Sequence, residues 1–232
     1  MFAMLRSAKL TSLRDERRMK KLYTWNTPNG QKPAILLEEL GEKYELVPVD
    51  ITNAAQFSAD FVKINPNSKI PAYADDDIVL FESGAILQHL ADERGRFLAL
   101  RGQERATTLS WCYWQVGSLG PMIGQWAHFI RADEKLPYAI DRYLTEIIRL
   151  YHVLERRLGE AKCLAGDNYS IADMMSFPWA KGGLMYLRNE ENRAADRLPP
   201  FPSVDRWIEK IDARPAGKTA IEWLAKETDS AS

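Results

Sequence analysis

The sequence predicts two domains: an α/β domain with a mixed four-stranded sheet, followed by an all-α helical bundle. Up to residue 94, short apolar segments alternate with segments of helical periodicity in the order β-α-β-α-β-β-α. A mixed sheet covered by helices would satisfy that order. Beyond residue 102, every segment has helical periodicity. Gly95 and Gly102 flank a charged stretch between the two parts. We therefore expect domains at 20–94 and 103–232, joined by a linker at 95–102.

Composition and charge narrow the class of protein. Of the 232 residues, 46% are apolar and 27% are charged, which is ordinary for a soluble globular protein. The formal net charge of −1 argues against a general role in binding nucleic acid or a membrane surface. No apolar run approaches the roughly 18 residues of a membrane span. Cys112 and Cys163 form no C-x-x-C pair, which fits a reducing, cytoplasmic compartment.

Residues 1–19 are polar and basic and contain no apolar segment of signal-peptide length. Asp15 and Glu16 argue against an organelle transit peptide. Met19 immediately precedes the first predicted strand, so an upstream start codon is one explanation of this segment. The other is a disordered tail, which we expect here, and no chemistry is assigned to it.

The elements of the first domain follow from local patterns. A short apolar and aromatic strand at 20–25 ends in the Asn-Thr-Pro-Asn-Gly loop at 26–30. Helical spacing from 31 to 40 stops at Gly41, a residue typical of a helix end. A second strand is predicted at 44–49 and a short helix at 57–64.

The most informative stretch is 65–91. Pro71 heads a strand, where its missing N–H disturbs the ladder least. The three aspartates at 75–77 form a hairpin turn, and 78–81 is the return strand. Ser83 stands where an N-cap belongs, ahead of a periodic apolar run. Free N–H groups at that helix start can hold an α-carboxylate, and Glu82 can hold an ammonium. The pattern predicts a receptor for an amino-acid zwitterion.

Two motifs at this spacing, N-P-N-S-K-I-P-A at 65–72 and F-E-S-G-A-I-L at 81–87, resemble the glutathione site of the glutathione transferase superfamily. The T-P-N-G-Q-K segment at 27–32 is similar to the bacterial nu-class branch, which is associated with glutathione-dependent disulfide reduction. The resemblance covers nearly the whole chain from Lys20. It implies a thioredoxin-like first domain, a cis bond before Pro71, glutathione as co-substrate and a homodimer.

The resemblance assigns roles within the first domain. Ile70 would pair its backbone with the cysteinyl part of glutathione, and Pro71 would turn that backbone toward the ligand. Thr27 and Asn29 would donate hydrogen bonds to the glutathione sulfur, beside a helix start that favours negative charge. Taken alone, Asn-Gly is often only a turn, and Glu82-Ser83 alone fits a solvated carboxylate beside a helix cap.

Gln56 and Lys69 are candidates for the glycyl carboxylate of glutathione. Gln56 matches the nu-class pattern, whereas Lys69 fits a solvated turn lysine equally well. His89, His128 and His152 have no metal-ligand spacing, so no metal is expected.

In the second domain we expect helices at 104–126, bending near Gly117, Gly120 and Pro121, and at 138–158, 202–213 and 216–226. Ser170 and Asp173 read as an N-cap box. The G-P-M-I-G-Q-W-A-H-F segment resembles the nu-class wall of the second-substrate cleft. The predicted residues of that cleft are Gln125, His128 and Phe129, with Arg142 and Arg149 as arginines that could reach a second glutathione or be solvated.

The leading hypothesis is a glutathione-dependent disulfide oxidoreductase in which the glutathione thiolate reacts. Cys112 lies in an apolar helix and Cys163 in a loop of the second domain, so neither is expected to be the nucleophile. A transferase that conjugates glutathione to electrophiles would use the same thiolate with an aromatic second site. A non-catalytic glutathione-binding module on the same fold is the third hypothesis.

Overall fold

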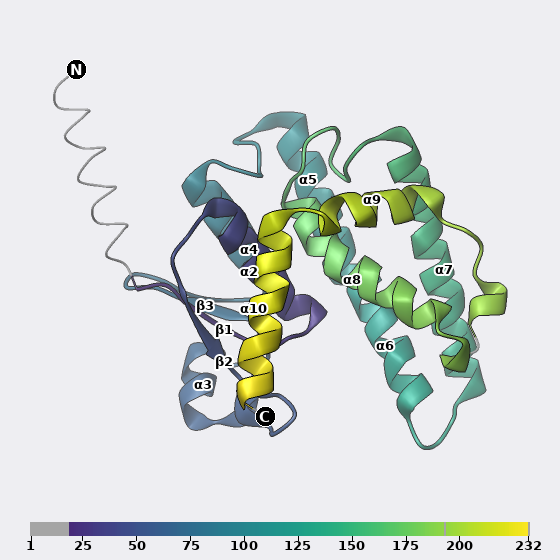
Figure 1. The fold of residues 1–232 in the computed structure, drawn as a ribbon, viewed down its shortest axis with the longest axis horizontal. Coiled ribbons are helices and arrows are strands. Elements are labelled where there is room, and N and C mark those ends of the chain that lie inside the picture. Colours follow the sequence, from purple (N-terminus) through teal and green to yellow (C-terminus); the bar gives the residue numbers. More distant parts are fainter. Residues whose placement is uncertain (1–18, 193, 232) are drawn as a thin grey trace.

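A four-stranded sheet organises the N-terminal part of the computed structural model, which describes residues 19–192 and 194–231 (Figure 1). The predicted tail at 1–19 lies outside the described residues except for Met19. The strand order is β2-β1-β3-β4, with β1 parallel to β2 and the other neighbouring pairs antiparallel. The strands are β1 Lys21–Thr24, β2 Glu45–Pro48, β3 Ala72–Ala74 and β4 Val79–Phe81. This is the mixed sheet of the thioredoxin-like fold, as predicted.

The alternation of side chains along the strands gives the sheet two apolar faces. Leu22 and Tyr73 are register partners and face the main core, with helices α2 (Pro28–Leu40) and α4 (Ser83–Arg94). Tyr23 and Ala72 face the other way, toward Phe61 of the short helix α3 (Ala59–Ile64). The 3-10 turn η1 (Ala55–Phe57) precedes α3. Both sides of the sheet are therefore covered.

The connections of this part follow their residue types. The carboxylate of Asp75 accepts hydrogen bonds from the backbone N–H groups of Asp77 and Ile78, both at 3.0 Å, which forms the predicted hairpin turn. Helix α2 ends at Gly41, whose φ of 73° lies in the left-handed region. The peptide bond between Ile70 and Pro71 is cis, as the resemblance implies.

The second part is helical throughout. Around Gly117, where a bend is predicted, the chain forms a π-helical segment, η2 (Gln115–Leu119), that joins α5 to α6. Beyond α6 the described chain contains four further α-helices and two short 3-10 turns. The bounds are α5 Gly102–Trp114, α6 Gly120–Arg131, α7 Pro137–Glu160, α8 Ile171–Arg188, η3 Glu190–Asn192, η4 Ala195–Arg197, α9 Pro202–Asp212 and α10 Pro215–Ala231.

The predicted cap box of α8 is confirmed and does more than cap. Asp173 accepts hydrogen bonds from Ser170 N–H at 3.0 Å, from Leu164 N–H at 2.9 Å and from the Trp207 indole at 2.9 Å. Its side chain is fully buried, and this burial raises the pKa of Asp173 although the hydrogen bonds oppose the shift. Asp173 therefore ties the start of α8 to α9 and to the loop before α8.

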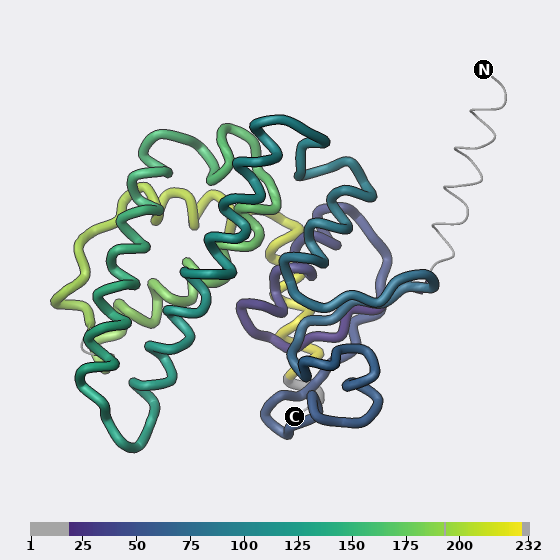
Figure 2. Tube along the Cα trace, turned by 180° about the vertical axis from the view of Figure 1, so that it is seen from behind, coloured from purple at the N-terminus to yellow at the C-terminus, as the bar shows by residue number. Residues whose placement is uncertain are grey.

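The two parts share one core. The same apolar cluster includes Leu22 of the sheet, Ile35 of α2 and Leu184 of α8. Helix α10 returns to the sheet part and lies along α2, where Trp223 meets the ring of Tyr44 at 4.8 Å (Figures 1 and 2). This shared packing fixes the position of the helical part against the start of α2.

Candidate functional site

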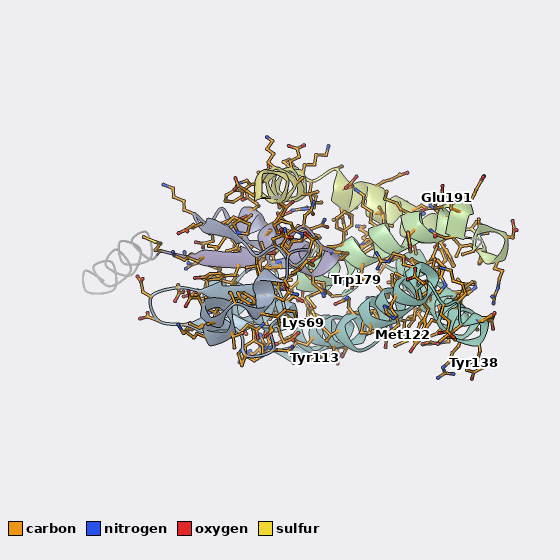
Figure 3. All side chains as sticks on the ribbon, turned by 90° about the horizontal axis from the view of Figure 1, so that it is seen from below. Lys69, Tyr113, Met122, Tyr138, Trp179 and Glu191 are labelled. Carbon is orange, nitrogen blue, oxygen red and sulfur yellow. The ribbon has the colours of Figure 1, made fainter. Side chains whose placement is uncertain are left out.

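A cleft of about 680 Å³ lies between the sheet part and the helical part. Figure 3 shows Lys69 in the sheet part and Trp179 in the helical part, and both residues line this cleft. Five of the predicted site residues line this cleft. Its lining residues are Thr27, Pro28, Asn29, Ile51, Gln56, Ser68, Lys69 and Ile70 from the sheet part, and Ile123, Gly124, Ala127, Arg131, Trp179, Gly182, Gly183 and Tyr186 from the helical part.

Thr27 stands at the start of α2, earlier than the helix start predicted at Gln31. Its hydroxyl oxygen accepts a hydrogen bond from the backbone N–H of Gly30 at 3.1 Å and so caps the helix. Capping uses a lone pair of the oxygen, and the hydroxyl proton stays available for an acceptor in the cleft. Gly30 is needed for close packing, because a Cβ there would lie 2.1 Å from the carbonyl oxygen of Trp25.

Asn29 is held by the helical part. The indole N–H of Trp179, on α8, donates a hydrogen bond to Asn29 Oδ1 at 2.7 Å. An indole N–H can only donate, so the atom facing it must be the amide oxygen of Asn29. Both protons of the Asn29 amide nitrogen are therefore free for a ligand acceptor. The sequence contains no local signal for this contact, because Trp179 lies 150 residues away from Asn29 in the chain.

The electrostatics of the cleft suit an anion. Lys69 and Arg131 are its cationic lining residues, and the N-terminal end of α2, whose dipole favours negative charge, also lines the cleft through Pro28 and Asn29. The oxygen Gln56 Oε1 is buried and has no hydrogen-bond partner among the described residues. This oxygen is an acceptor, so a ligand N–H and not an anion would satisfy it, whereas the Gln56 NH2 can donate to an anion.

Glu82 and Ser83 follow β4 directly, and the sheet register brings them to Ile70. Ala72 pairs with Phe81, so the antiparallel chains place Pro71 beside Glu82. Glu82 has a φ of 71°, a conformation that is costly for a residue with a side chain and that collects at functional sites. Its exposed carboxylate makes no capping hydrogen bond.

The predicted N-cap is displaced by one residue. Glu82 occupies the N-cap position of α4, and Ser83 is the first helical residue. The Ser83 hydroxyl therefore caps nothing. It accepts a hydrogen bond from Lys32 Nζ at 3.4 Å instead, while Lys32 also donates to Gln115 Oε1 at 2.7 Å. Burial lowers the pKa of Lys32 to about 7.

The residues predicted to form the helical wall of the cleft lie elsewhere. Gln125 and His128 are exposed, and Phe129 stacks on Tyr143 of α7 with ring centroids 5.7 Å apart. The reason is the phase of α6: Gly124, Ala127 and Arg131 lie at helical spacing and turn to the cleft, about 100° away from their neighbours. The usable signal was the pair of small residues Gly124 and Ala127, which leaves room for a ligand.

The two predicted arginines are also outside this cleft. Arg142 lines a separate hollow at the far end of α7, together with Tyr138 and Asp141, and Figure 3 shows Tyr138 far from Lys69. Arg149 forms an ion pair with Glu146, one turn away on the same helix, at 2.7 Å. The cation that the helical part contributes to the cleft is Arg131.

Both cysteines are buried and lie outside the cleft lining. Burial raises the pKa of Cys112 to about 12 and that of Cys163 to about 11. Either sulfur would thus remain a protonated, weak nucleophile at neutral pH.

Residues 19–192 and 194–231 contain neither a metal-binding cluster nor a membrane-spanning helix. No group of three or more His, Cys, Asp or Glu residues there could hold a metal ion. None of the helices in that part is both long and apolar enough to cross a membrane.

Comparisons with known proteins identify a family of glutathione-binding proteins. The family models for the glutathione S-transferase N-terminal and C-terminal domains match residues 18–92 and 121–215. The disulfide-bond oxidoreductase YfcG of Escherichia coli is 45% identical over 211 residues, covering 88% of this chain and 94% of that protein.

Two solved structures show what similar proteins bind. A glutathione transferase family member from Pseudomonas fluorescens, with two glutathione bound, has a TM-score of 0.80 at 36% identity, covering 88% of this chain and 92% of that one. A glutathione transferase from Pseudomonas putida has a TM-score of 0.81 at 36% identity, covering 88% of this chain and 90% of that one. Its structure contains one glutathione disulfide bound per subunit.

Proposed function

The chain belongs to the glutathione S-transferase family, and on that premise we propose that it is a glutathione-dependent disulfide oxidoreductase. The observation that carries the proposal is the set of donors around one point of the cleft. Thr27 keeps a free hydroxyl proton, and Asn29 keeps both amide protons because Trp179 occupies its oxygen. Such donors stabilise a thiolate without being able to take its proton.

The chemistry is thiol–disulfide exchange in two steps. The thiolate of a bound glutathione attacks one sulfur of a substrate disulfide, forms a mixed disulfide and releases the other half as a thiolate. A second glutathione thiolate attacks the mixed disulfide, giving oxidised glutathione and the second substrate thiolate. Each step breaks one S–S bond and forms one, so electrons balance with two glutathiones per disulfide.

The protein supplies thiolate stabilisation and positioning. A thiol with an ordinary pKa near 8.5 is roughly 5–10% ionised near pH 7.4. Lowering that pKa by about two units raises the ionised fraction to roughly 90%, a gain of about tenfold. Because this gain is modest, holding both sulfurs in line within the cleft must provide the rest of the acceleration.

We assign the ligand's groups to the residues as follows. Lys69 and the Gln56 amide meet the glycyl carboxylate, the Ile70 backbone meets the cysteinyl part after the turn at Pro71, and Glu82 with Ser83 meets the zwitterion of the γ-glutamyl group. Support comes from the cationic lining, from the place of Gln56 in that lining, where its amide NH2 can donate to a carboxylate, and from the register that puts Pro71 beside Glu82. Arg131 replaces Arg142 and Arg149 as our candidate for a carboxylate of a second glutathione.

Parallel turnover assays test the proposal. The purified protein with glutathione should reduce a small disulfide such as a hydroxyethyl disulfide much faster than it conjugates an aryl halide. The reverse preference would favour the transferase hypothesis. Glutathione binding without either activity would favour a binding module.

The T-P-N-G-Q-K segment at 27–32 supports placing the chain in the nu-class branch.

We also propose a homodimer and a cytoplasmic location. Tyr113 is 65% exposed, and with Val116 it borders a largely apolar hollow of about 550 Å³ over α4 and α5. Apolar surface of this kind fits a second copy of the chain. Two unpaired cysteines fit a reducing compartment. Light scattering should give twice the 26.5 kDa chain mass, and Tyr113→Glu should shift it toward the monomer.

A further inference from the structure

Lys32 is a buried charged residue to which the chemistry above gives no task. Its side chain is only 1% exposed, and lysine is rarely buried unless it is paired with an acid. Its Nζ donates to two neutral oxygens, Gln115 Oε1 at 2.7 Å and Ser83 Oγ at 3.4 Å. No carboxylate among the side chains that the structure describes forms an ion pair with it.

Groups from three other elements face Lys32. Gln115 comes from η2, Ser83 from the first turn of α4, and the Cys112 thiol from α5. Glu82, at the N-cap of α4, is the acid that acts on it at a distance. Burial is the dominant effect and lowers the pKa of Lys32 to about 7, while Cys112 and Glu82 act in the opposite direction. The Cys112 thiol is itself neutral near pH 7 because burial raises its pKa to about 12.

Ser83 connects Lys32 to the ligand end of the site. An ammonium can only donate, so Lys32 occupies a lone pair of Ser83 Oγ and leaves the hydroxyl proton for another acceptor. Ser83 begins α4, where unpaired backbone N–H groups and the helix dipole favour an anion. A carboxylate bound there would be separated from the ammonium by a single hydroxyl group.

We propose that Lys32 is the buried countercharge for the α-carboxylate of the γ-glutamyl group, acting through the Ser83 hydroxyl, and that glutathione binding draws a proton onto Lys32. Lys32 is thus a positioning residue. This inference rests on the proposed function, because it takes glutathione at Ser83 as given. An anion about 5 Å away, at an effective dielectric constant near 20, raises the proton affinity of an ammonium on the order of a hundredfold.

Proton counting tests the inference without turnover. The probe is S-methylglutathione, which has no thiol proton to release. Calorimetric titrations in buffers of different ionisation enthalpy count the protons exchanged per ligand. At pH 7.5 roughly three-quarters of Lys32 is neutral in the free protein, so we expect uptake of about 0.5–0.7 proton, falling toward zero at pH 5.5.

Variants separate the effect of the Lys32 charge from the effect of its hydrogen bond to Gln115, which joins α2 to η2. Lys32→Met should lose the uptake and bind S-methylglutathione roughly 30-fold more weakly. Gln115→Met removes the other hydrogen-bond partner but keeps the ammonium, so it should keep the uptake. Lys32→Arg keeps the charge without titrating near neutral pH and should bind without taking up a proton.

The outcomes that overturn the inference differ from those that overturn the function. Tight binding by the parent protein with no proton uptake at pH 7.5 rejects the role of Lys32 alone, and needs no variant. Equal uptake in Lys32→Met rejects it as well. Failure of the parent protein to bind S-methylglutathione rejects the glutathione site itself, and the inference falls with it.

Discussion

Asn29, which lines the cleft, is held by the indole N–H of Trp179, whereas Ser83, outside the cleft lining at the start of α4, is held by Lys32. The indole, and Lys32 when it is protonated, can only donate, and each then fixes which atom its neighbour presents to a ligand. They differ in charge. The indole orients Asn29 equally at every pH, whereas Lys32 orients Ser83 and adds a charge that depends on pH. We call the region of Thr27 and Asn29, which we assign to the glutathione sulfur, the thiol end, and the region of Glu82 and Ser83 the γ-glutamyl end. We infer that the thiol end sets the geometry of the sulfur and that the γ-glutamyl end sets the affinity for glutathione.

Removing both donors at the thiol end should give the largest effect. Thr27→Ala with Asn29→Ala deletes two hydrogen bonds to a thiolate, and turnover of a small disulfide should fall about a hundredfold. Glutathione affinity should change much less, because the ligand's ends are untouched. Thr27→Ser is the matched control, since it keeps both the hydroxyl and the cap of α2. An unchanged rate constant would remove the sulfur-stabilising role of this end.

At the γ-glutamyl end, Glu82→Gln should act on affinity. The change removes the charge partner of the ligand ammonium. Because Glu82 is exposed in the free protein, we expect a loss near the low end for such pairs, roughly 20-fold. Calorimetric titration of the folded variant measures it, with Glu104→Gln on α5 as a control. Affinity within threefold of the parent protein would contradict the assignment.

The charge of Lys32 should also appear in stability. Folding lowers its pKa from 10.5 to about 7, so between these pH values the unfolded chain binds more protons, and rising pH favours the folded state. Relative to Lys32→Met, the free energy of unfolding of the parent protein should rise by about 2 kcal/mol from pH 7 to pH 9. Urea titrations at both pH values give this difference. A constant difference would mean that Lys32 titrates normally.

Trp179→Phe sharpens the comparison, because it keeps the ring and removes only the N–H. The Asn29 amide could then turn its oxygen toward the sulfur. Turnover should fall about fivefold, and the pH at which bound glutathione ionises should rise by roughly half a unit to one unit. Thiolate absorbance near 240 nm follows that ionisation. Trp223→Phe, whose indole meets Glu227 away from the cleft, should leave it unchanged.

Much of the fold could be predicted from the sequence because its signals are local. Pro71 at a strand start, the aspartate turn at 75–77, Gly41 after α2 and the Ser170–Asp173 box each depend on neighbouring residues. The register of the hairpin then brings Glu82 beside Pro71, as the two motifs require. Boundaries moved by a few residues where a cap decides them, as at Thr27 and Glu82.

The side chains that complete the site could not be predicted in this way. Trp179 reaches Asn29 across 150 residues, and Lys32 reaches Gln115 across 83. Such contacts depend on how the helical part sits on the sheet part. The phase of α6 depends on the same packing, so Gln125, His128 and Phe129 lie outside the lining of this cleft, and Arg131, which lines it, was not predicted.

The central claim is that the reacting sulfur belongs to glutathione and not to the protein. Both protein thiols are buried, and burial holds the pKa of each well above neutral. The most direct test is the rate of the variant Cys112→Ala with Cys163→Ser, measured with glutathione and a small disulfide. We predict a rate within about threefold of the parent protein, because only packing at residue 112 is lost. A hundredfold fall in a well-folded sample would show that a protein thiol is the nucleophile.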